Sequence, residues 1–339
     1  MDGIKKVLCI ASEPAAGMVP FASMFINEKV NSGMEVHAIT VSDGQNRYSP
    51  LIDSRVHLTD LGYPTTLSGK FAVKFFPARF YALVRKVALK NDIKDVFLLT
   101  GEYGFGLGYS RLLKRDFNLH FIIHDLEAHP DSGESLKNRM FNRFFHRMTL
   151  NNIRTVDNLL TCSRAQAAEL HESFPEKNVE YFPFPSLVTD GMKDGSKVCP
   201  ELNGIDNYIL FFGRVSAYKG IDLLYNAFLD GNIETKLVIA GNGTPYFSRR
   251  KDEHDVIWIN RFIRDEEVRM LFSNAKVVVY PYIQATMSGV LSIAHYFETK
   301  TVVSDLPFFI DNISDGDIVF KCGDKDGLSR ILSEIYRIG

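Results

Sequence analysis

Cysteine and tryptophan are scarce in this sequence. Its 339 residues include one tryptophan and four cysteines without paired spacing, namely Cys9, Cys162, Cys199 and Cys322. Isolated cysteines argue against a disulfide framework and against a cysteine-rich zinc site. Such usage is typical of a reducing compartment, so we expect a cytoplasmic protein.

Long apolar runs and charge of one sign are missing as well. No stretch of about 18 apolar residues is present, so we expect no membrane-spanning helix. The segment MDGIKKVLCIASEP holds an apolar run too short for a signal peptide and predicts a first strand instead. Lys and Arg total 39 against 41 Asp and Glu, a net charge of -2, so nucleic acid is not an expected partner.

The sequence does contain a regular alternation of short apolar runs with helical patterns. The predicted strands are 7–11, 35–41, 95–100, 120–124, 159–162, 208–212, 236–240, 256–260, 277–280, 301–304 and 318–320. This alternation predicts an α/β protein with doubly wound parallel sheets that are covered by helices on both faces.

A break in the alternation predicts the domain boundary. FPFPSLVTDGMKDGSKVCPELNGID, residues 182–206, is rich in proline, glycine and charge. We therefore predict an N-terminal domain over 1–185, a linker over 186–204 and a C-terminal domain over 205–339. Ligands of such folds bind beyond the carboxyl ends of the strands, so we expect the site in a central cleft between two domains.

FFGRVSAYKG, residues 211–220, is the first candidate for a ligand loop, because it connects an expected strand to an expected helix. Gly213 would let the backbone approach a ligand, Arg214 offers a fork of donors for phosphate oxygens, and Lys219 adds a point charge. The same residues also fit an ordinary solvated loop, and this loop alone leaves both interpretations open.

Three more motifs follow at the same expected sheet edge: AGNG at 240–243, NRFIRDEEV at 260–268 and YPYIQATMSGV at 280–290. In this order and spacing, residues 205–330 resemble the donor domain of retaining glycosyltransferases of the GT-B fold, glycosyltransferase family 4 (glycosyl transferases group 1). The first half is similar more loosely, through its strand order and through HDLEAHPDSGE at 124–134.

The resemblance implies two Rossmann-like domains and an enzyme whose donor substrate is a nucleotide-diphosphate sugar, with no metal and no further cofactor. Arg214 and Lys219 would bind the donor diphosphate and stabilise the leaving group, and His124 would lie near the reacting sugar. The implied donor-binding residues are Gly17, Gly213, Gly241, Asn242, Gly243, Arg261, Phe262, Ile263, Gln284, Thr286, Ser288, Gly289 and Val290, and the acceptor-side residues are Asp125 and His129.

The sequence departs from that family at two acidic positions. The family usually carries two glutamates eight positions apart, which correspond here to Thr286 and Ala294, or to Gln284 and Ser292 in a register shifted by two. A glutamine can hydrogen-bond sugar hydroxyls but cannot stabilise positive charge on an oxocarbenium-like sugar. Two alternatives therefore stay open, a non-catalytic nucleotide-sugar-binding partner of a glycan assembly complex and a nucleotide-sugar 2-epimerase on the same fold.

Three other motifs have ordinary explanations. Asp315-Gly316-Asp317 and Asp324-Lys325-Asp326 imitate a metal-binding Asp-x-Asp, but their context predicts turns. GEYGFGLGYS, residues 101–110, lacks the dinucleotide-binding spacing and predicts a close-packed or acceptor-side loop.

Two basic segments in the first half bear on the acceptor. Residues 70–90 hold six Lys or Arg and no acid, and residues 137–148 hold four among Phe and Met residues. Each fits either an interfacial helix on an anionic membrane or an ordinary amphipathic helix. By resemblance, we expect a metal-independent hexosyltransferase that acts on a surface polysaccharide or a lipid-linked oligosaccharide, with peripheral contact to the inner membrane surface.

Overall fold

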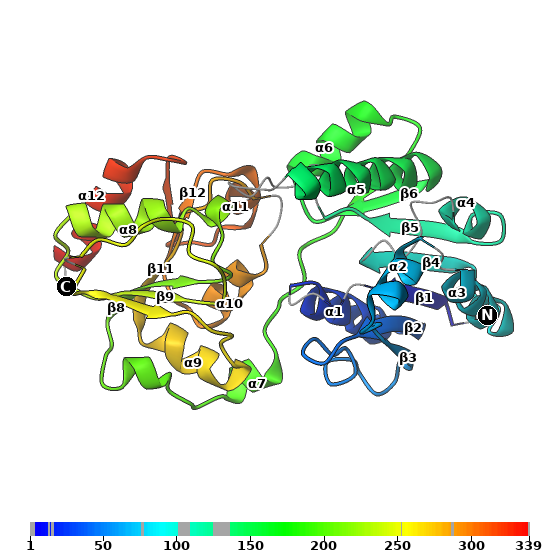
Figure 1. Cartoon of the computed structure of the whole chain (residues 1–339), viewed down its shortest axis with the longest axis horizontal. Coiled ribbons are helices and arrows are strands. Elements are labelled where there is room, and N and C mark those ends of the chain that lie inside the picture. Colours follow the sequence, from blue (N-terminus) through cyan, green and yellow to red (C-terminus); the bar gives the residue numbers. More distant parts are fainter. Residues whose placement is uncertain are drawn as a thin grey trace. The chain divides into compact units, whose positions relative to one another are not determined.

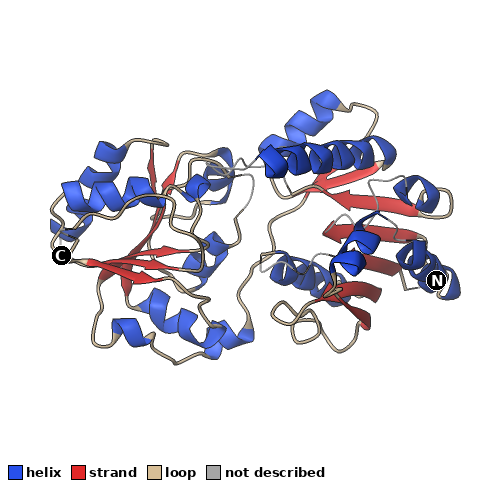
Figure 2. Ribbon diagram, in the orientation of Figure 1, coloured by secondary structure: helices blue, strands red, loops and turns tan. Residues whose placement is uncertain are grey.

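The computed structural model describes residues 4–12, 14, 17–75, 78–100, 109–124, 136–251, 253–285 and 288–337. They form two compact units, one up to Pro185 and one from Ser186. Each unit is a parallel sheet with helices on both faces (Figures 1 and 2). The predicted α/β class with two Rossmann-like units is therefore confirmed.

The N-terminal unit contains a seven-stranded sheet of order β3-β2-β1-β4-β5-β6-β7. Its strands are β1 (Lys6–Ala11), β2 (Glu35–Ser42), β3 (His57–Gly62), β4 (Asp95–Thr100), β5 (Asn118–Ile122), β6 (Asn158–Thr161) and β7 (Asn178–Tyr181). Its helices are α1 (Met18–Asn31), α2 (Leu67–Phe75), α3 (Ala78–Lys90), α4 (Tyr109–Leu113), α5 (Leu136–Thr155) and α6 (Arg164–Ser173). The strand order reverses between β1 and β4, which makes their carboxyl ends the switch point where such folds bind ligands.

The C-terminal unit contains a six-stranded sheet of order β10-β9-β8-β11-β12-β13. Its strands are β8 (Tyr208–Phe212), β9 (Leu237–Ala240), β10 (Val256–Ile259), β11 (Ala275–Tyr280), β12 (Thr301–Ser304) and β13 (Ile318–Phe320). Its helices are α7 (Asp190–Asp194), α8 (Ile221–Asp230), α9 (Asp265–Ser273), α10 (Val290–Tyr296), α11 (Pro307–Asn312) and α12 (Lys325–Arg337), with 3-10 turns over Pro200–Leu202 and Ala217–Lys219. In Figure 1, α8 and α12 lie together on one face of this sheet and α9 lies on the other. The switch point of this unit lies between β8 and β11.

The sequence missed two strands, and both are the outermost strands of the N-terminal sheet. The β3 sequence HLTDLG has two leucines as its apolar side chains and no buried residue, and only one residue of the four-residue β7 is buried. Edge strands lack the continuous apolar run of a strand that is buried on both faces. The expected strand 120–124 was shifted as well, because β5 ends at Ile122 and leaves His124 beyond the strand.

Helix α3 packs into the core of the N-terminal unit. Its buried residues Phe80, Val84 and Ala88 recur every four positions and contact the apolar side chains of the sheet. Helix α1 covers the other face, where the rings of Phe25 and Phe97 lie 5.7 Å apart. The basic segment 70–90 therefore forms, over α3, an ordinary amphipathic helix with its apolar stripe turned inward.

Residues 186–204, expected to form a linker, pack against the C-terminal unit. Thr189 caps α7 by accepting a hydrogen bond from the amide of Met192, and it donates to the carboxylate of Asp265 on α9 at 2.6 Å. Val188, Cys199 and Leu202 are buried, so this segment contributes apolar contacts despite its polar composition.

Both Asp-rich motifs form turns, as predicted. The amide of Ser314 donates to Asp317, and Gly316 has a φ of 94°. Asp324 accepts a hydrogen bond from the amide of Gly327 at the start of α12. These carboxylates are therefore occupied by local turn and cap hydrogen bonds.

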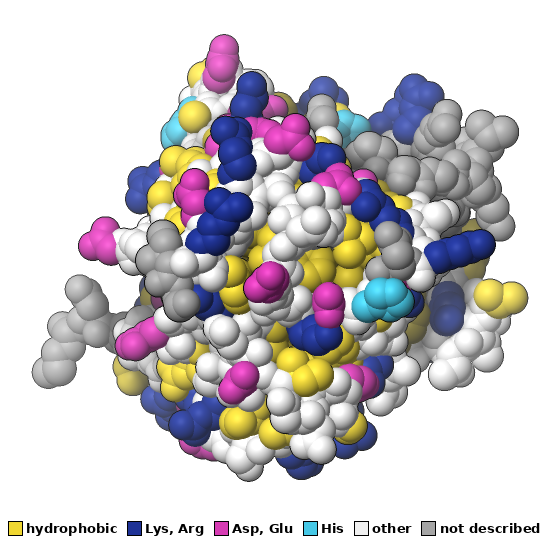
Figure 3. Space-filling view, turned by 90° about the vertical axis from the view of Figure 1, so that its left-hand side faces the viewer, with side chains coloured by type: hydrophobic (Ala, Val, Ile, Leu, Met, Phe, Trp, Pro, Cys, Tyr) yellow, Lys and Arg dark blue, Asp and Glu magenta, His cyan; other side chains and the backbone are white. Residues whose placement is uncertain are grey.

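Two general properties of the surface and the helices agree with the composition. Among the described residues, no helix has the length and apolarity that crossing a bilayer requires. On the face drawn in Figure 3, cationic and anionic side chains are interspersed around small apolar areas. That face therefore presents no field of one sign to a polyanion.

Candidate functional site

Three loops pack together at the carboxyl edge of the C-terminal sheet. They follow β8 (residues 213–220), β9 (residues 241–243) and β11 (residues 281–283), and we call them the loop platform. The loops after β8 and β11 flank the switch point, where a ligand is expected in this fold class.

Glycines hold the first two of these loops in backbone contact. A Cβ atom on Gly241 would lie 1.9 Å from the carbonyl oxygen of Gly213, and one on Gly243 would lie 2.2 Å from that of Val215. The amide of Gly213 donates to the carbonyl of Ala240, and that of Val215 to the carbonyl of Asn242, both at 3.0 Å. The Gly-Asn-Gly turn is thus required by loop packing, and the side chain of Asn242 is left exposed.

The third loop is joined to the first in the same way. Gly220 has a left-handed φ of 63°, and a Cβ atom there would lie 1.9 Å from the carbonyl oxygen of Pro281. The amide of Ile283 donates to the carbonyl of Tyr218 at 2.9 Å. The platform is therefore a fixed backbone scaffold that holds side chains at the switch point.

The two cations on the platform have different surroundings. Arg214 is exposed, and it forms no hydrogen bond or ion pair with the described part of the chain. Lys219 is only 8% exposed, and its ammonium lies 3.8 Å from the ring centroid of Tyr282 and 5.0 Å from that of Tyr218. Cation–π contacts fix the position of Lys219 without neutralising its charge.

Tyr282 extends this arrangement toward α10. Its hydroxyl shares a 3.2 Å hydrogen bond with the hydroxyl of Ser288, which precedes the N-cap residue Gly289 and the first helical residue Val290. Burial raises the pKa of Tyr282 well above its usual value, so the phenol stays neutral. The predicted residues Lys219 and Ser288 are thereby brought together through one aromatic side chain that the sequence analysis did not single out.

The loop after β10 carries three of the expected donor-binding residues, Arg261, Phe262 and Ile263. Arg261 is held by two carboxylates, because its guanidinium pairs with Glu201 at 3.0 Å and with Glu267 at 2.8 Å. Ile263 is buried, whereas the ring of Phe262 is 67% exposed at the sheet edge. An exposed aromatic ring beside a candidate ligand site is the better candidate for contact with a base.

The positions of the expected glutamates have distinct surroundings. Gln284 is exposed, whereas Thr286 lies outside the described residues. Ala294 is fully buried, so a carboxylate there would be desolvated. Ser292 instead accepts a hydrogen bond from the amide of Leu187 and donates to the carbonyl of Gly289, which leaves it a structural role.

In the N-terminal unit, His124 and Gly17 lie beside the switch point between β1 and β4. Because the carbonyl of Leu99 only accepts, the 2.7 Å contact requires the Nε2 atom of His124 to carry a proton. Gly17 is the N-cap of α1, and a Cβ atom on it would meet no described atom within 4 Å. Asp125, His129 and the 101–108 part of GEYGFGLGYS lie outside the described residues.

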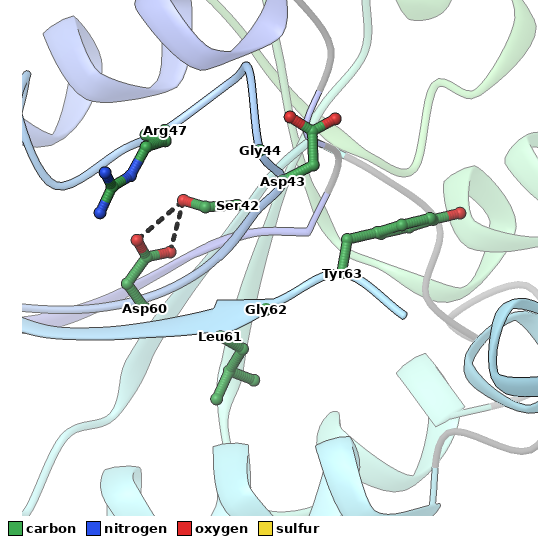
Figure 4. A pocket seen from close by; sticks show the side chains of 8 residues that line it. All are labelled: Ser42, Asp43, Gly44, Arg47, Asp60, Leu61, Gly62 and Tyr63. Carbon is green, nitrogen blue, oxygen red and sulfur yellow. Dashed lines mark hydrogen bonds between the residues drawn. The ribbon is translucent and has the colours of Figure 1, made fainter. Parts of the chain in front are cut away.

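A pocket of about 420 Å³ opens at the carboxyl ends of β2 and β3 (Figure 4). The Asp60 carboxylate accepts hydrogen bonds from Thr40 and Ser42, each at 2.7 Å, and Arg47 and Tyr63 also line the pocket. The sequence analysis missed this pocket because it did not predict β3. The run Ser42-Asp43-Gly44 at the end of a predicted strand was the signal available for it.

Comparisons with known proteins bear on both units. Residues 206–337 match the family model of the glycosyl transferases group 1. No curated protein matches the sequence significantly. The fold is similar to that of HepE from Anabaena in complex with UDP and glucose, at 13% identity and a TM-score of 0.66, over 97% of this chain and 89% of that chain.

Two further solved structures share the fold over almost the whole chain. Sucrose-phosphate synthase from Thermosynechococcus elongatus is 14% identical with a TM-score of 0.68, over 98% of this chain and 89% of that chain. WaaG, a glycosyltransferase involved in lipopolysaccharide biosynthesis, is 16% identical with a TM-score of 0.61, over 98% of this chain and 90% of that chain. At these identities the likeness establishes the fold, which is that of GT-B proteins.

Proposed function

Because this chain carries a group 1 glycosyltransferase domain over residues 206–337 on a GT-B fold, we propose that it is a retaining, metal-independent enzyme of family 4. It transfers a hexosyl unit from a nucleotide sugar to a sugar hydroxyl of a surface polysaccharide or a lipid-linked oligosaccharide. The observation that carries this proposal is the loop platform, which places one exposed cation and one buried cation at the switch point of the C-terminal sheet.

The donor diphosphate binds to Arg214 and Lys219 in this proposal. Arg214 gives up no ion pair with a described residue on binding, so its guanidinium can form bidentate hydrogen bonds with phosphate oxygens at little cost. Lys219 is already desolvated and fixed against Tyr282, so its charge is preorganised to stabilise the diphosphate as it departs. Backbone amides of Ser288, Gly289 and Val290 supply further donors.

The nucleobase stacks on Phe262, and the adjacent backbone hydrogen-bonds its edge. An exposed ring in the loop after β10 supports this position, because Asn260 of that loop accepts a hydrogen bond from the amide of Gly243 on the platform. The similar structures of HepE and of a protein bound with UDP-2-fluoro glucose make UDP-glucose the first donor to test. Arg261 contributes to base binding indirectly. Its ion pairs with Glu201 and Glu267 hold the loop after β10 in place.

Catalysis in this proposal needs no carboxylate of the enzyme. The departing diphosphate takes the proton of the acceptor hydroxyl while the acceptor enters on the same face of the sugar. Gln284 holds sugar hydroxyls, and the cations stabilise the leaving group. The absence of a carboxylate at Thr286 and Ala294, or at Gln284 and Ser292 in the shifted register, also favours one alternative, a nucleotide-sugar-binding protein without turnover.

The acceptor binds to the N-terminal unit, with the pocket of Figure 4 as its sugar site. Carboxylates such as Asp60 and an aromatic ring such as Tyr63 are suited to sugar hydroxyls and to a sugar face. Helix α2 gives the peripheral membrane contact, because Leu67 is 86% and Phe71 57% exposed on one helical face beside Lys70. This assignment replaces α3, whose apolar stripe is buried.

The test is sugar transfer by the purified chain. UDP-, GDP-, ADP- and CMP-sugars are combined with soluble and lipid-linked saccharides in the presence of EDTA, and the product linkage is read by NMR. Nucleotide release that needs both substrates and a retained anomeric configuration support the proposal. Tight nucleotide-sugar binding without turnover identifies the non-catalytic alternative, and a changed sugar without acceptor identifies the epimerase.

A further inference from the structure

A cluster of potential metal ligands lies at the amino ends of β2 and β3, and none of its residues belongs to the proposed donor or acceptor sites. Glu35 and His37 are the first and third residues of β2, so their side chains point to the same face of the sheet. His57 is the first residue of β3 and pairs directly with His37 across the two strands. The pocket of Figure 4 lies at the opposite, carboxyl ends of the same strands.

The three side chains already approach a coordinating arrangement. The nearest ligand atoms of Glu35, His37 and His57 all lie within 4.8 Å of one another. The Nε2 atom of His37 lies 3.2 Å from a carboxylate oxygen of Glu35. Two ligands of one tetrahedral zinc ion, at bond lengths near 2.0–2.1 Å, are separated by roughly 3.3 Å. Two of the three ligands therefore already have the spacing of a shared ion.

The remaining ligand can complete the site by a side-chain movement. The rings of His37 and His57 are stacked, with centroids 4.5 Å apart and planes inclined by 25°. His37 is 7% exposed and fixed, whereas His57 is exposed and has room to turn its ring toward the ion. Exposure of His57 also gives the ion and one water molecule access from solvent.

The charges around this cluster allow a cation to bind with moderate affinity. The ammonium of Lys6 lies 3.4 Å from one oxygen of Glu35, and the other oxygen faces His37. The oxygen that faces His37 lies 3.2 Å from the Nε2 atom of that ring and is not the oxygen that Lys6 contacts. The charge of Lys6 repels a bound metal ion, which limits the affinity. The oxygen of Glu35 that faces His37 has no contact with Lys6 and remains available to the ion.

We propose that Glu35, His37 and His57 bind one divalent transition-metal ion of the zinc class, with water as the fourth ligand. Two imidazoles and one carboxylate suit zinc, cobalt(II) or nickel(II) better than magnesium or calcium. The ion takes the place of the hydrogen bond between His37 and Glu35 and joins β3 to β2. Since β3 is the edge strand of the described sheet and pairs with β2, the metal stabilises that strand and takes no part in sugar transfer.

The experiment titrates zinc into the untagged, EDTA-stripped full chain by calorimetry, alongside His57→Gln. The matched control is His171→Gln, because His171 is an exposed histidine of the same unit outside the cluster. We expect one equivalent to bind to the wild type and to the control, and binding at least about tenfold weaker in His57→Gln. Cobalt(II) should give tetrahedral absorption bands that His37→Gln abolishes.

A second readout separates a site from adventitious binding. Zinc should slow amide hydrogen exchange in β3 of the wild type and leave it unchanged in His57→Gln. Equal zinc affinity in the wild type and His57→Gln, or no saturable binding to the wild type, would overturn the proposal. Nucleotide binding is measured on the same stripped samples, so a failed metal site and a failed donor site are distinguishable.

Discussion

The ammonium of Lys219 lies 3.8 Å from the ring centroid of Tyr282, and the lysine is only 8% exposed. The two residues come from different loops, after β8 and after β11, and their contact spans the switch point of the C-terminal sheet. Contact with two aromatic rings fixes the position of this ammonium and leaves its positive charge in place.

Replacing Lys219 with methionine therefore separates charge from packing. Methionine has a similar length and keeps the contact with Tyr282, so the free energy of unfolding should fall by less than about 2 kcal/mol. Affinity for nucleoside diphosphates should fall by roughly tenfold or more, since a charge-assisted hydrogen bond is lost. Calorimetry with UDP measures this, and Lys251→Met is the control because Lys251 is exposed elsewhere in the unit. Unchanged UDP affinity would refute the assigned role of Lys219.

Phe262 should contribute to binding without contributing to stability. Its ring is 67% exposed, so Phe262→Ala should leave the thermal midpoint unchanged. Loss of stacking on one base costs about 1–3 kcal/mol, which lowers UDP affinity by roughly fivefold to 150-fold. Inorganic pyrophosphate should bind equally well to the variant and to the wild type. An equal loss for UDP and pyrophosphate would place Phe262 at the phosphates instead of the base.

Replacement by alanine should affect stability strongly at one glycine of the candidate site and hardly at all at another. Gly241→Ala places a Cβ atom 1.9 Å from the carbonyl oxygen of Gly213, so it should destabilise the C-terminal unit by more than about 3 kcal/mol. Gly17→Ala meets no described atom within 4 Å at a helical φ of -83°, so it should change stability by less than about 0.5 kcal/mol. Denaturant unfolding measures both. A stable Gly241→Ala variant would contradict the backbone packing of the platform.

The Arg261 ion pairs should make stability depend on pH in the acidic range. The guanidinium of Arg261 lowers the pKa of Glu267, so the pair stabilises the fold above the unfolded-state value near 4.3. This contribution, about 2 kcal/mol, is lost as the pH falls through the lower folded-state pKa. Glu267→Gln should therefore be less stable than the wild type at pH 7, and the difference should shrink toward pH 3. Glu266→Gln, an exposed neighbour on α9, should show no such difference.

The sequence predicted the sheets well where strands are buried on both faces. Strands such as β8, YILFF, and β12, TVVS, are continuous apolar runs, and their boundaries were correct. The polar edge strand β3 was missed, and with it the Asp60 pocket and the His57 cluster. Both features depend on register with β2, which links residues about 20 positions apart through a strand that composition does not reveal.

The sequence motifs identified the candidate donor residues. The structure was needed to explain why these residue types occupy those positions. Gly241 was expected to bind the donor. In the structure, position 241 must be glycine because a Cβ atom there would collide with the carbonyl oxygen of Gly213, which lies 28 positions earlier in the sequence. Arg261 was expected at the donor, whereas its guanidinium is paired with Glu201, 60 residues earlier. Contacts over such separations are set by the packing of loops, which local patterns do not encode.

The most direct test of the central claim is calorimetric titration of UDP-glucose, and then of GDP-, ADP- and CMP-sugars, into the wild type and Arg214→Ala. Arg214 is exposed and has no partner among the described residues, so its removal should leave the thermal midpoint unchanged. The account predicts saturable binding of one nucleotide series to the wild type and at least about tenfold weaker binding to Arg214→Ala. Equal binding to both proteins, or no binding of any nucleotide to the wild type, would contradict the assignment of the loop platform as a donor site.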